Sequence, residues 1–372
     1  MNVKRQSNFE LLRIISMLFI VIYHLIFHGN IIKNCSNQGV AIIFTIIELI
    51  TIVHVNSFIL VTGYFQSNSK FKQSKVWSLI NSNLFYRIVI ILILSILGYI
   101  SLSKIEIVKE IFILNLNQYW FIKVYLFLYC LSPFLNKFIN SLDKKYYQKL
   151  LLLLFVIFSF IPYFTGNQGF DNNGYTLYNF IFLYFIGAYL RKYPLSKSYI
   201  FKNISKSLLR VFFLFTFIFC VLLNFLLLTS SQALLNTNSF INEVANNTIN
   251  MTLMYSNPII IIQSIAFFLL FETFSIKSKL INNISKLTLG IYMIHDNSYL
   301  RPLILNFTKI TNRSFNSYTS IIYLLLVALI LYIVCAFIEY LRIAIFKFIY
   351  NRKISTKVRE KYYKYLNNLK TD

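Results

Sequence analysis

Long apolar runs alternate with short polar segments along this chain, and most of the runs are long enough to cross a membrane. A transmembrane helix needs about 20 mostly apolar residues. By that measure the pattern predicts ten helices, at residues 11–28, 40–63, 84–101, 119–139, 149–165, 176–190, 208–229, 251–275, 286–300 and 318–346. The expected fold class is an all-α integral membrane protein, a bundle of about ten transmembrane helices.

The basic residues between the apolar runs predict the orientation of these helices. If the N-terminus is inside, the segments on that side are rich in Lys and Arg, as in 70–75, whereas two loops on the other side, 166–175 and 230–250, contain neither. Positive charge collects in cytoplasmic loops of membrane proteins. We therefore expect both termini in the cytoplasm, with 1–348 as one transmembrane domain and 349–372 as a basic cytoplasmic tail.

Composition supports a membrane protein and argues against a nucleic-acid-binding one. Of the 372 residues, 57% are hydrophobic and 13% are charged, and the mean hydropathy is +0.63. The 36 Lys and Arg against 12 Asp and Glu give a net charge of +24. These basic residues fall between apolar runs and form no continuous face, so they fit topology signals and contacts with anionic membrane lipid. No nucleic-acid partner is expected.

Two ionisable residues in the first apolar run are the leading candidates for chemistry. Arg13 and His24 are eleven residues apart, which places them within roughly 20° of each other on a helix and about 16 Å apart along its axis. Ionisable groups inside a membrane helix are costly and usually functional. An imidazole can take a proton from a hydroxyl, and a guanidinium binds phosphate. The alternative is a His24 that packs against a neighbouring helix and bonds a backbone carbonyl. With Glu10, one turn before Arg13, these form the candidate catalytic set.

Three consecutive polar residues, His295, Asp296 and Asn297, end an apolar run in the second half of the chain. Side chains of this kind at membrane depth need partners inside the protein. They form either a structural network or a site that binds the acceptor and supports catalysis, with Asp296 orienting a histidine.

The start of the fourth predicted helix carries a further polar group. Tyr119 and Trp120 fit either a belt of aromatic residues at the membrane interface, the commoner case, or a surface that stacks on a sugar. Lys123 follows one turn later, and a lysine that faces a helix bundle usually has a partner or a ligand. All three are candidate substrate-binding residues.

The remaining polar residues of the first two helices predict no metal site. Glu48 and His54 are six residues apart, so they do not share a helix face, and packing or pore lining is the preferred interpretation. His28 follows His24 by one turn, but no third ligand stands at a suitable spacing for zinc.

Five segments together resemble the membrane acyltransferase 3 family. They are 7–15 (SNFELLRII) followed by His24, 55–65 (VNSFILVTGYF), 118–136 (beginning QYWFI and ending YCLSPFLN), 185–190 (FIGAYL) and 289–297 (LGIYMIHDN). The segments occur in the order expected for the family and extend over most of the chain. Bacterial members of this family O-acylate cell-surface and secreted polysaccharides.

The resemblance implies roles for particular residues. Arg13 and His24 match the family's arginine and histidine pair, so His24 would be the catalytic base and Arg13 would help to hold an acyl-CoA. The family's second arginine pair is missing here, and Lys72, Lys75 and Arg87 are the nearest basic candidates for donor binding. The implied donor is acetyl-CoA or another short acyl-CoA, with no metal. The implied acceptor is a polysaccharide or an undecaprenyl-linked glycan at a bacterial cytoplasmic membrane.

An exporter of polysaccharide or lipid-linked sugar is the alternative from another functional class. Transporters commonly contain helices interrupted by Gly or Pro in both halves. Nine glycines and five prolines in 372 residues offer few such interruptions. The chain also lacks the phosphate-binding and nucleophile motifs of ATP-driven pumps and serine hydrolases.

Overall fold

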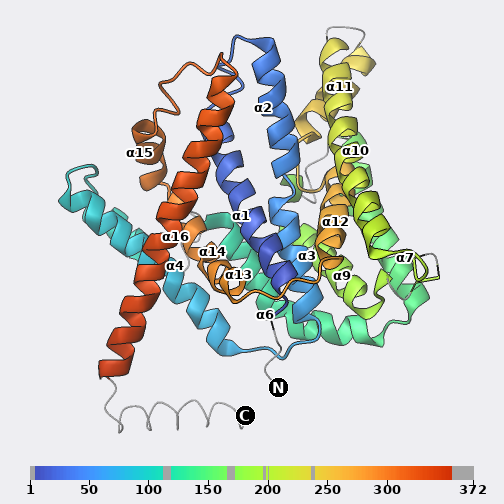
Figure 1. Ribbon diagram of the computed structural model, residues 1–372, viewed down its shortest axis with the longest axis horizontal. Helices are drawn as coiled ribbons and strands as arrows, with labels where there is room; N and C mark the ends of the chain where they lie inside the picture. The colour runs from blue at the N-terminus through green and yellow to red at the C-terminus, as the bar shows by residue number, and fades with distance from the viewer. Residues whose placement is uncertain are drawn as a thin grey trace.

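The computed structural model describes residues 5–111, 119–165, 172–195, 198–199, 201–235 and 239–353, and this part of the chain is helical without any strand. The elements, drawn in Figure 1, are α1 Ser7–His28, α2 Gln38–Thr51, α3 His54–Gln66, α4 Gln73–Ile96, α5 Lys104–Ile111, α6 Trp120–Ser141, α7 Lys144–Phe155, the π-helix η2 Val156–Phe160, α8 Ile161–Thr165, the 3-10 helix η3 Asn172–Gly174, α9 Leu177–Lys192, α10 Lys206–Ala233, α11 Ser239–Met251, α12 Pro258–Glu272, α13 Lys279–Ile284, the 3-10 helix η5 Ser285–Leu287, α14 Thr288–His295, α15 Leu300–Phe307 and α16 Thr319–Lys353. The predicted all-α membrane fold is confirmed.

Seven stretches in the described part of the chain are long and apolar enough to cross a membrane, with mean hydropathies from 1.3 to 3.1. They are Ser7–His28, Gln38–Gln66, Gln73–Ile96, Trp120–Ser141, Lys144–Thr165, Lys206–Ala233 and Thr319–Phe348. Each overlaps one of the predicted spans. The other three predicted spans, 176–190, 251–275 and 286–300, correspond to shorter helices. The total of ten spans and the cytoplasmic position of the termini stay predictions, although α1 begins and α16 ends toward the same end of the bundle (Figure 1).

Two of the predicted helices are interrupted where an asparagine side chain bonds to the backbone. Asn257 caps α12 through a bond from the Ile259 amide, and Pro258 occupies the first turn, so the predicted helix 251–275 is interrupted before Pro258. The predicted helix 286–300 is also wrong in length, because α14 ends at His295. The side chain of Asn297 accepts from the Leu300 amide and starts α15 instead.

The predicted helix 40–63 is divided by a short turn at 52–53 into α2 and α3. The His54 side chain replaces a backbone partner at this turn, because its Nδ1 lies 2.7 Å from the Thr51 carbonyl oxygen. The third predicted span is also displaced: α4 begins at Gln73 and ends at Ile96, not at 84 and 101. It ends because Gly98 adopts a left-handed backbone with φ of 74°.

Two glycines explain how closely α3 and α9 pack. A Cβ atom on Gly63 would lie 2.2 Å from the Tyr184 carbonyl oxygen, and one on Gly187 would lie 2.2 Å from the Leu60 carbonyl oxygen. Only glycine allows two backbones to approach to this distance. These glycines belong to the segments 55–65 and 185–190 that the sequence analysis singled out.

The first helix occupies the centre of the molecule. α1 packs against α2, α3, α12, α13, α14 and α16 (Figure 1). Its buried residues contribute to both hydrophobic clusters of the core, Phe9 and Leu12 to one and Met17 and Val21 to the other. α1 is therefore held on most sides, which fixes the directions of its polar side chains.

The described residues include only the start of the predicted tail. α16 continues through Lys353, past the boundary predicted at 348. The rest of the predicted tail, 354–372, lies outside the described residues.

Candidate active site

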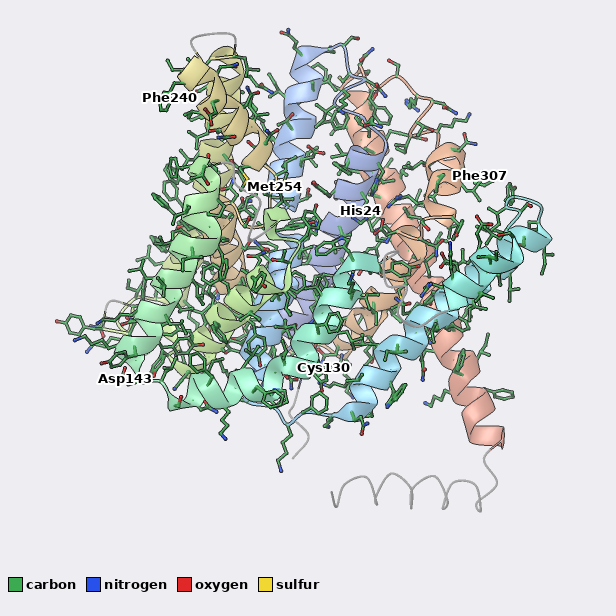
Figure 2. The ribbon with its side chains drawn as sticks, turned by 180° about the vertical axis from the view of Figure 1, so that it is seen from behind. His24, Cys130, Asp143, Phe240, Met254 and Phe307 are labelled. Carbon is green, nitrogen blue, oxygen red and sulfur yellow. The ribbon has the colours of Figure 1, made fainter. Side chains whose placement is uncertain are left out.

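A cavity of about 280 Å³ runs beside α1 and brings together both ends of its ionisable face. Arg13 and His24 both line it, so the prediction that they share a helix face is confirmed. α3, α4 and α6 supply much of the remaining wall, including Phe58, Leu79 and Trp120. Figure 2 shows His24 well inside the bundle.

The Arg13 end of the cavity is positively charged. Arg13 Nη1 lies 2.9 Å from Glu10 Oε1, and Arg5 Nη1 lies 3.8 Å from Glu10 Oε2. Glu10 is only 6% exposed, so it needs these partners. Lys286 lines the same cavity. Two arginines around one carboxylate, with Lys286 elsewhere on the cavity wall, leave positive charge for a phosphate-bearing ligand.

Two lysines lie close to this end without lining the cavity. Lys75 is exposed, and its Nζ lies 5.5 Å from the centre of the Tyr129 ring. Leu79, one turn after Lys75 on the same face of α4, does line the cavity, so Lys75 lies one turn away from the cavity wall. The Lys72 amide donates to the Tyr129 hydroxyl at 3.0 Å, which fixes the segment before α4.

At the other end, hydrogen bonds define which nitrogen of His24 carries a proton. His295 Nδ1 lies 2.7 Å from the Ile291 carbonyl oxygen, and a carbonyl can only accept, so this nitrogen carries the hydrogen. In the neutral ring His295 Nε2 is then an acceptor, and it lies 3.1 Å from His24 Nδ1. His24 Nδ1 therefore donates. The remaining nitrogen, His24 Nε2, has the free lone pair that a general base needs.

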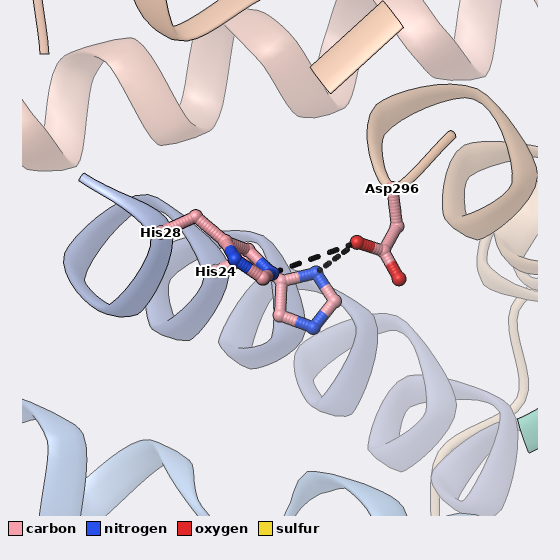
Figure 3. A group of neighbouring side chains, drawn as sticks. All are labelled: His24, His28 and Asp296. Carbon is pink, nitrogen blue, oxygen red and sulfur yellow. Dashed lines mark ion pairs between the residues drawn. The ribbon is translucent and has the colours of Figure 1, made fainter. Parts of the chain in front are cut away.

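A carboxylate and a guanidinium complete the histidine cluster. In Figure 3 Asp296 extends from the end of α14 toward His24 and His28, with Asp296 Oδ1 at 3.5 Å from His24 Nδ1 and 3.8 Å from His28 Nε2. Arg301 Nη1 lies 2.8 Å from Asp296 Oδ1 and 3.1 Å from His28 Nε2.

The same three side chains are spaced as metal ligands could be. One ligand atom each from His24, His28 and Asp296 lies within 4.8 Å of the others. The Arg301 guanidinium, however, already donates to the carboxylate and to His28 Nε2. The guanidinium thus supplies the positive charge that a metal ion would bring. Its hydrogen bonds also occupy the lone pairs that would bind a metal.

Aromatic side chains form part of the wall of the same cavity. Trp120 stacks on Tyr255 at a centroid distance of 5.9 Å and an interplanar angle of 26°. The Tyr255 hydroxyl lies 3.1 Å from His54 Nε2, while His54 Nδ1 already bonds the Thr51 carbonyl. Because both of its nitrogens are occupied, His54 supports the wall and is not free to act as a base.

A comparison with protein families identifies the class to which this site belongs. A family model described as an acyltransferase domain, that of acyltransferase 3, matches residues 6–340. This chain belongs to the acyltransferase 3 family. It is a multi-pass membrane acyltransferase, and the match includes the helices that line the cavity. Comparisons with curated proteins and with solved structures gave no match.

Several predicted site residues of the acyltransferase lie outside the cavity. Tyr119 is fully buried, donating to the Met293 carbonyl at 2.6 Å and accepting from Asn297 at 2.9 Å. Lys123 is exposed on α6. Arg87 is fully buried and pairs with Glu110 at 2.9 Å, which ties α5 to α4.

Sequence reasoning also missed residues that this acyltransferase places around the cavity or the histidine cluster. Arg5, Lys286, Arg301 and Tyr255 were not among the candidate site residues. Lys286 and Arg301 flank the polar segment 289–297, and this closeness in sequence could have marked them as candidate site residues. No local signal connects Tyr255 with Trp120, because their contact depends on tertiary packing.

Proposed function

We propose that this membrane acyltransferase is an O-acetyltransferase that transfers acetyl from acetyl-CoA to a hydroxyl of a surface polysaccharide or its undecaprenyl-linked precursor. The membrane would be the cytoplasmic membrane of a bacterium. The observation that carries the proposal is that one cavity is lined both by the cationic Arg13 end of α1 and by His24, whose Nδ1 is engaged by His295.

The donor is proposed to lie along α1. Its phosphates would bind Arg5, Arg13 and Lys286, with Lys72 and Lys75 at the approach, because guanidinium and ammonium groups pair well with phosphate oxygens. The long, unbranched part of the pantetheine arm of a CoA would follow the cavity along α1, past wall residues such as Met17 and Phe58. Its thioester would then reach the region of His24.

The transfer step assigns one proton movement to His24. Its Nε2 takes the proton of the acceptor hydroxyl while the oxygen attacks the thioester carbonyl. The carbon–sulfur bond then breaks, and the CoA sulfur leaves with the proton returned by His24. His295 would keep the Nδ1 of the imidazole hydrogen-bonded during the cycle, and the nearby Asp296 carboxylate would stabilise the positive charge that the ring acquires.

The acceptor is proposed to be a carbohydrate because of the family to which the chain belongs. Trp120 is the predicted substrate residue that lines the cavity, and its aromatic neighbours give a surface suited to a sugar ring. The exporter alternative gains no support from the family match, which is to an acyltransferase domain.

The decisive experiment uses purified protein in lipid nanodiscs with acetyl-CoA labelled in the acetyl group. Wild-type protein is expected to release CoA thiol and to place label on glycan added as acceptor. In cells, proton NMR should show O-acetyl signals in the surface glycan that disappear when the gene is deleted. An exporter would give no CoA release and an unchanged O-acetyl content.

A matched pair of variants identifies the base. His24→Ala, inserted and folded as judged by its elution on size exclusion, is expected to lose transfer. Lys137→Ala, which removes an exposed charge on α6 outside the cavity, is expected to retain it. Full O-acetylation by His24→Ala would disprove the assignment.

A further inference from the structure

A second cavity, of about 460 Å³, lies at the end of α1 away from Arg13. Its lining includes Phe27, His28, Asn30, Lys33, Glu48 and Leu253. His28 belongs both to this lining and to the histidine cluster, since its ring lies 5.3 Å from that of His24. The cavity therefore ends one helical turn short of the candidate base, at His28, on the side opposite the donor's phosphates. Its volume is in the range of small-ligand sites.

Glu48 is a buried charged group of this cavity that has no side-chain partner among the described residues. It is only 6% exposed, on α2. Its backbone carbonyl accepts from Ile52 and Thr51, but its carboxylate has neither an ion pair nor a hydrogen-bond donor among the described residues. The other buried glutamates, Glu10 and Glu339, are paired with arginines. A buried carboxylate without donors is unfavourable, so a ligand that supplies donors would be bound there.

The charges around Glu48 favour a neutral ligand over a cationic one. Lys33 lies at the cavity wall, so positive charge is already present in this cavity. An ammonium ligand would be repelled by it. Hydroxyl groups can donate to a carboxylate without adding charge.

The apolar part of the lining suits a sugar ring. Phe27 is 55% exposed, and its ring stacks parallel to Tyr23, which holds it in place. An aromatic face beside hydrogen-bonding groups is the usual composition of a ligand pocket. Asn30 and His28 add further polar groups beside the carboxylate.

We propose that this second cavity binds a carbohydrate ring of the acceptor, with the Glu48 carboxylate accepting hydrogen bonds from sugar hydroxyls. The inference rests on the proposed function for its identity as an acceptor site, since donor and acceptor would then meet at His24 from opposite ends of α1. Glu48 binds the sugar and takes no part in the transfer of the proton.

The test measures carbodiimide labelling of Glu48 in the full-length protein in nanodiscs, followed by mass spectrometry of the peptide. Octyl β-D-glucoside below its micelle concentration is the probe. At ten times its dissociation constant, labelling of Glu48 should slow about tenfold, because only empty sites react. Labelling of the exposed Glu243 should stay constant, which provides an internal reference.

Two other amphiphiles with the same chain define the outcomes that overturn the proposal. Protection by 1-octanol equal to that by the glucoside would show that only the apolar chain binds. Stronger protection by octyltrimethylammonium would show a cation site. No protection by the glucoside would equally contradict the proposal.

A kinetic measurement separates this inference from the proposed function. Glu48→Gln keeps the size of the side chain but removes its charge. It should raise the KM for octyl β-D-glucoside as acceptor by about tenfold or more, the scale of a hydrogen bond to a charged group, and leave the KM for acetyl-CoA unchanged. Protection without any acetyl transfer would retain the carbohydrate site and reject the O-acetyltransferase. Transfer with an unchanged acceptor KM in Glu48→Gln would retain the enzyme and reject the site.

Discussion

The two ends of the cavity along α1 are built from different kinds of interaction. At Arg13 the contacts are ion pairs, of 2.9 Å to Arg13 and 3.8 Å to Arg5 around one carboxylate. At His24 they form a chain of hydrogen bonds that runs through His295 to the Ile291 carbonyl, of 3.1 and 2.7 Å. One end has excess charge, and the other has a defined proton position.

This difference follows from what each end is proposed to do. Binding a polyanionic donor requires net positive charge, and the exact position of each proton matters little because guanidinium groups stay protonated. Accepting a proton requires one nitrogen to be free while the other is fixed. Substitutions at the two ends should therefore change different kinetic constants.

The largest effect is expected at the base itself. His24→Gln removes the proton acceptor and should lower kcat by about 10² to 10⁴, the usual contribution of general base catalysis. The KM for acetyl-CoA should change little, since the cationic end is intact. Initial rates of CoA thiol release at several acetyl-CoA concentrations check this. A variant that changed only KM would place the base elsewhere.

A smaller loss is expected from the residue that positions the base. His295→Leu removes the acceptor for His24 Nδ1 and should lower kcat by about tenfold to hundredfold, the range for loss of a group that orients an imidazole. His295→Gln can still accept through its side-chain oxygen and should restore most of the rate. Equal losses in both variants, measured across a pH series, would indicate a purely structural role.

Substitutions at the donor end should change the KM for acetyl-CoA. Arg13→Ala should raise the KM for acetyl-CoA by about tenfold, the scale of a charge-assisted hydrogen bond, with a smaller effect on kcat. It also leaves the buried Glu10 without its nearest partner. Arg13→Ala combined with Glu10→Gln should therefore recover part of the lost stability, as measured by thermal unfolding, without recovering KM. Recovery of both would mean that Arg13 acts only through Glu10.

A change outside both ends should affect stability alone. Gly187→Ala forces α9 away from α3, because the new Cβ would meet a backbone oxygen at 2.2 Å. It should lower the free energy of unfolding by about 1 to 3 kcal/mol. Gly39→Ala is the matched control, since its Cβ would meet the movable Tyr318 hydroxyl at 2.8 Å. Thermal unfolding of the two variants in the same detergent compares them. An equal shift would contradict the account of this contact.

The smallest expected effect is that of a chelator. Because Arg301 already donates to Asp296 and His28, treatment with EDTA should leave the transfer rate unchanged. Metal analysis of the purified protein checks the same point. Loss of activity on chelation, restored by zinc, would show that the histidine cluster holds a metal when Arg301 moves.

The helical class, the position of the longest spans and the first catalytic candidates could be predicted from local patterns. Apolar run length identified the seven long stretches, and the period of the helix placed Arg13 and His24 on one face. Helix ends were less predictable, because the breaks at Thr51, Asn257 and Asn297 depend on side-chain bonds to the backbone. A hydropathy pattern contains no record of such bonds.

The sequence by itself determined that this protein is a helical membrane protein and that α1 carries an arginine and a histidine on one face, since both properties depend on residues near each other in the chain. Only the tertiary structure decided which groups surround that face. Residues 271 positions apart bring His295 to His24. Glu48 is unpaired within the described residues because the described helices around it bring no donor. Such contacts depend on how distant helices pack, and no local period encodes them.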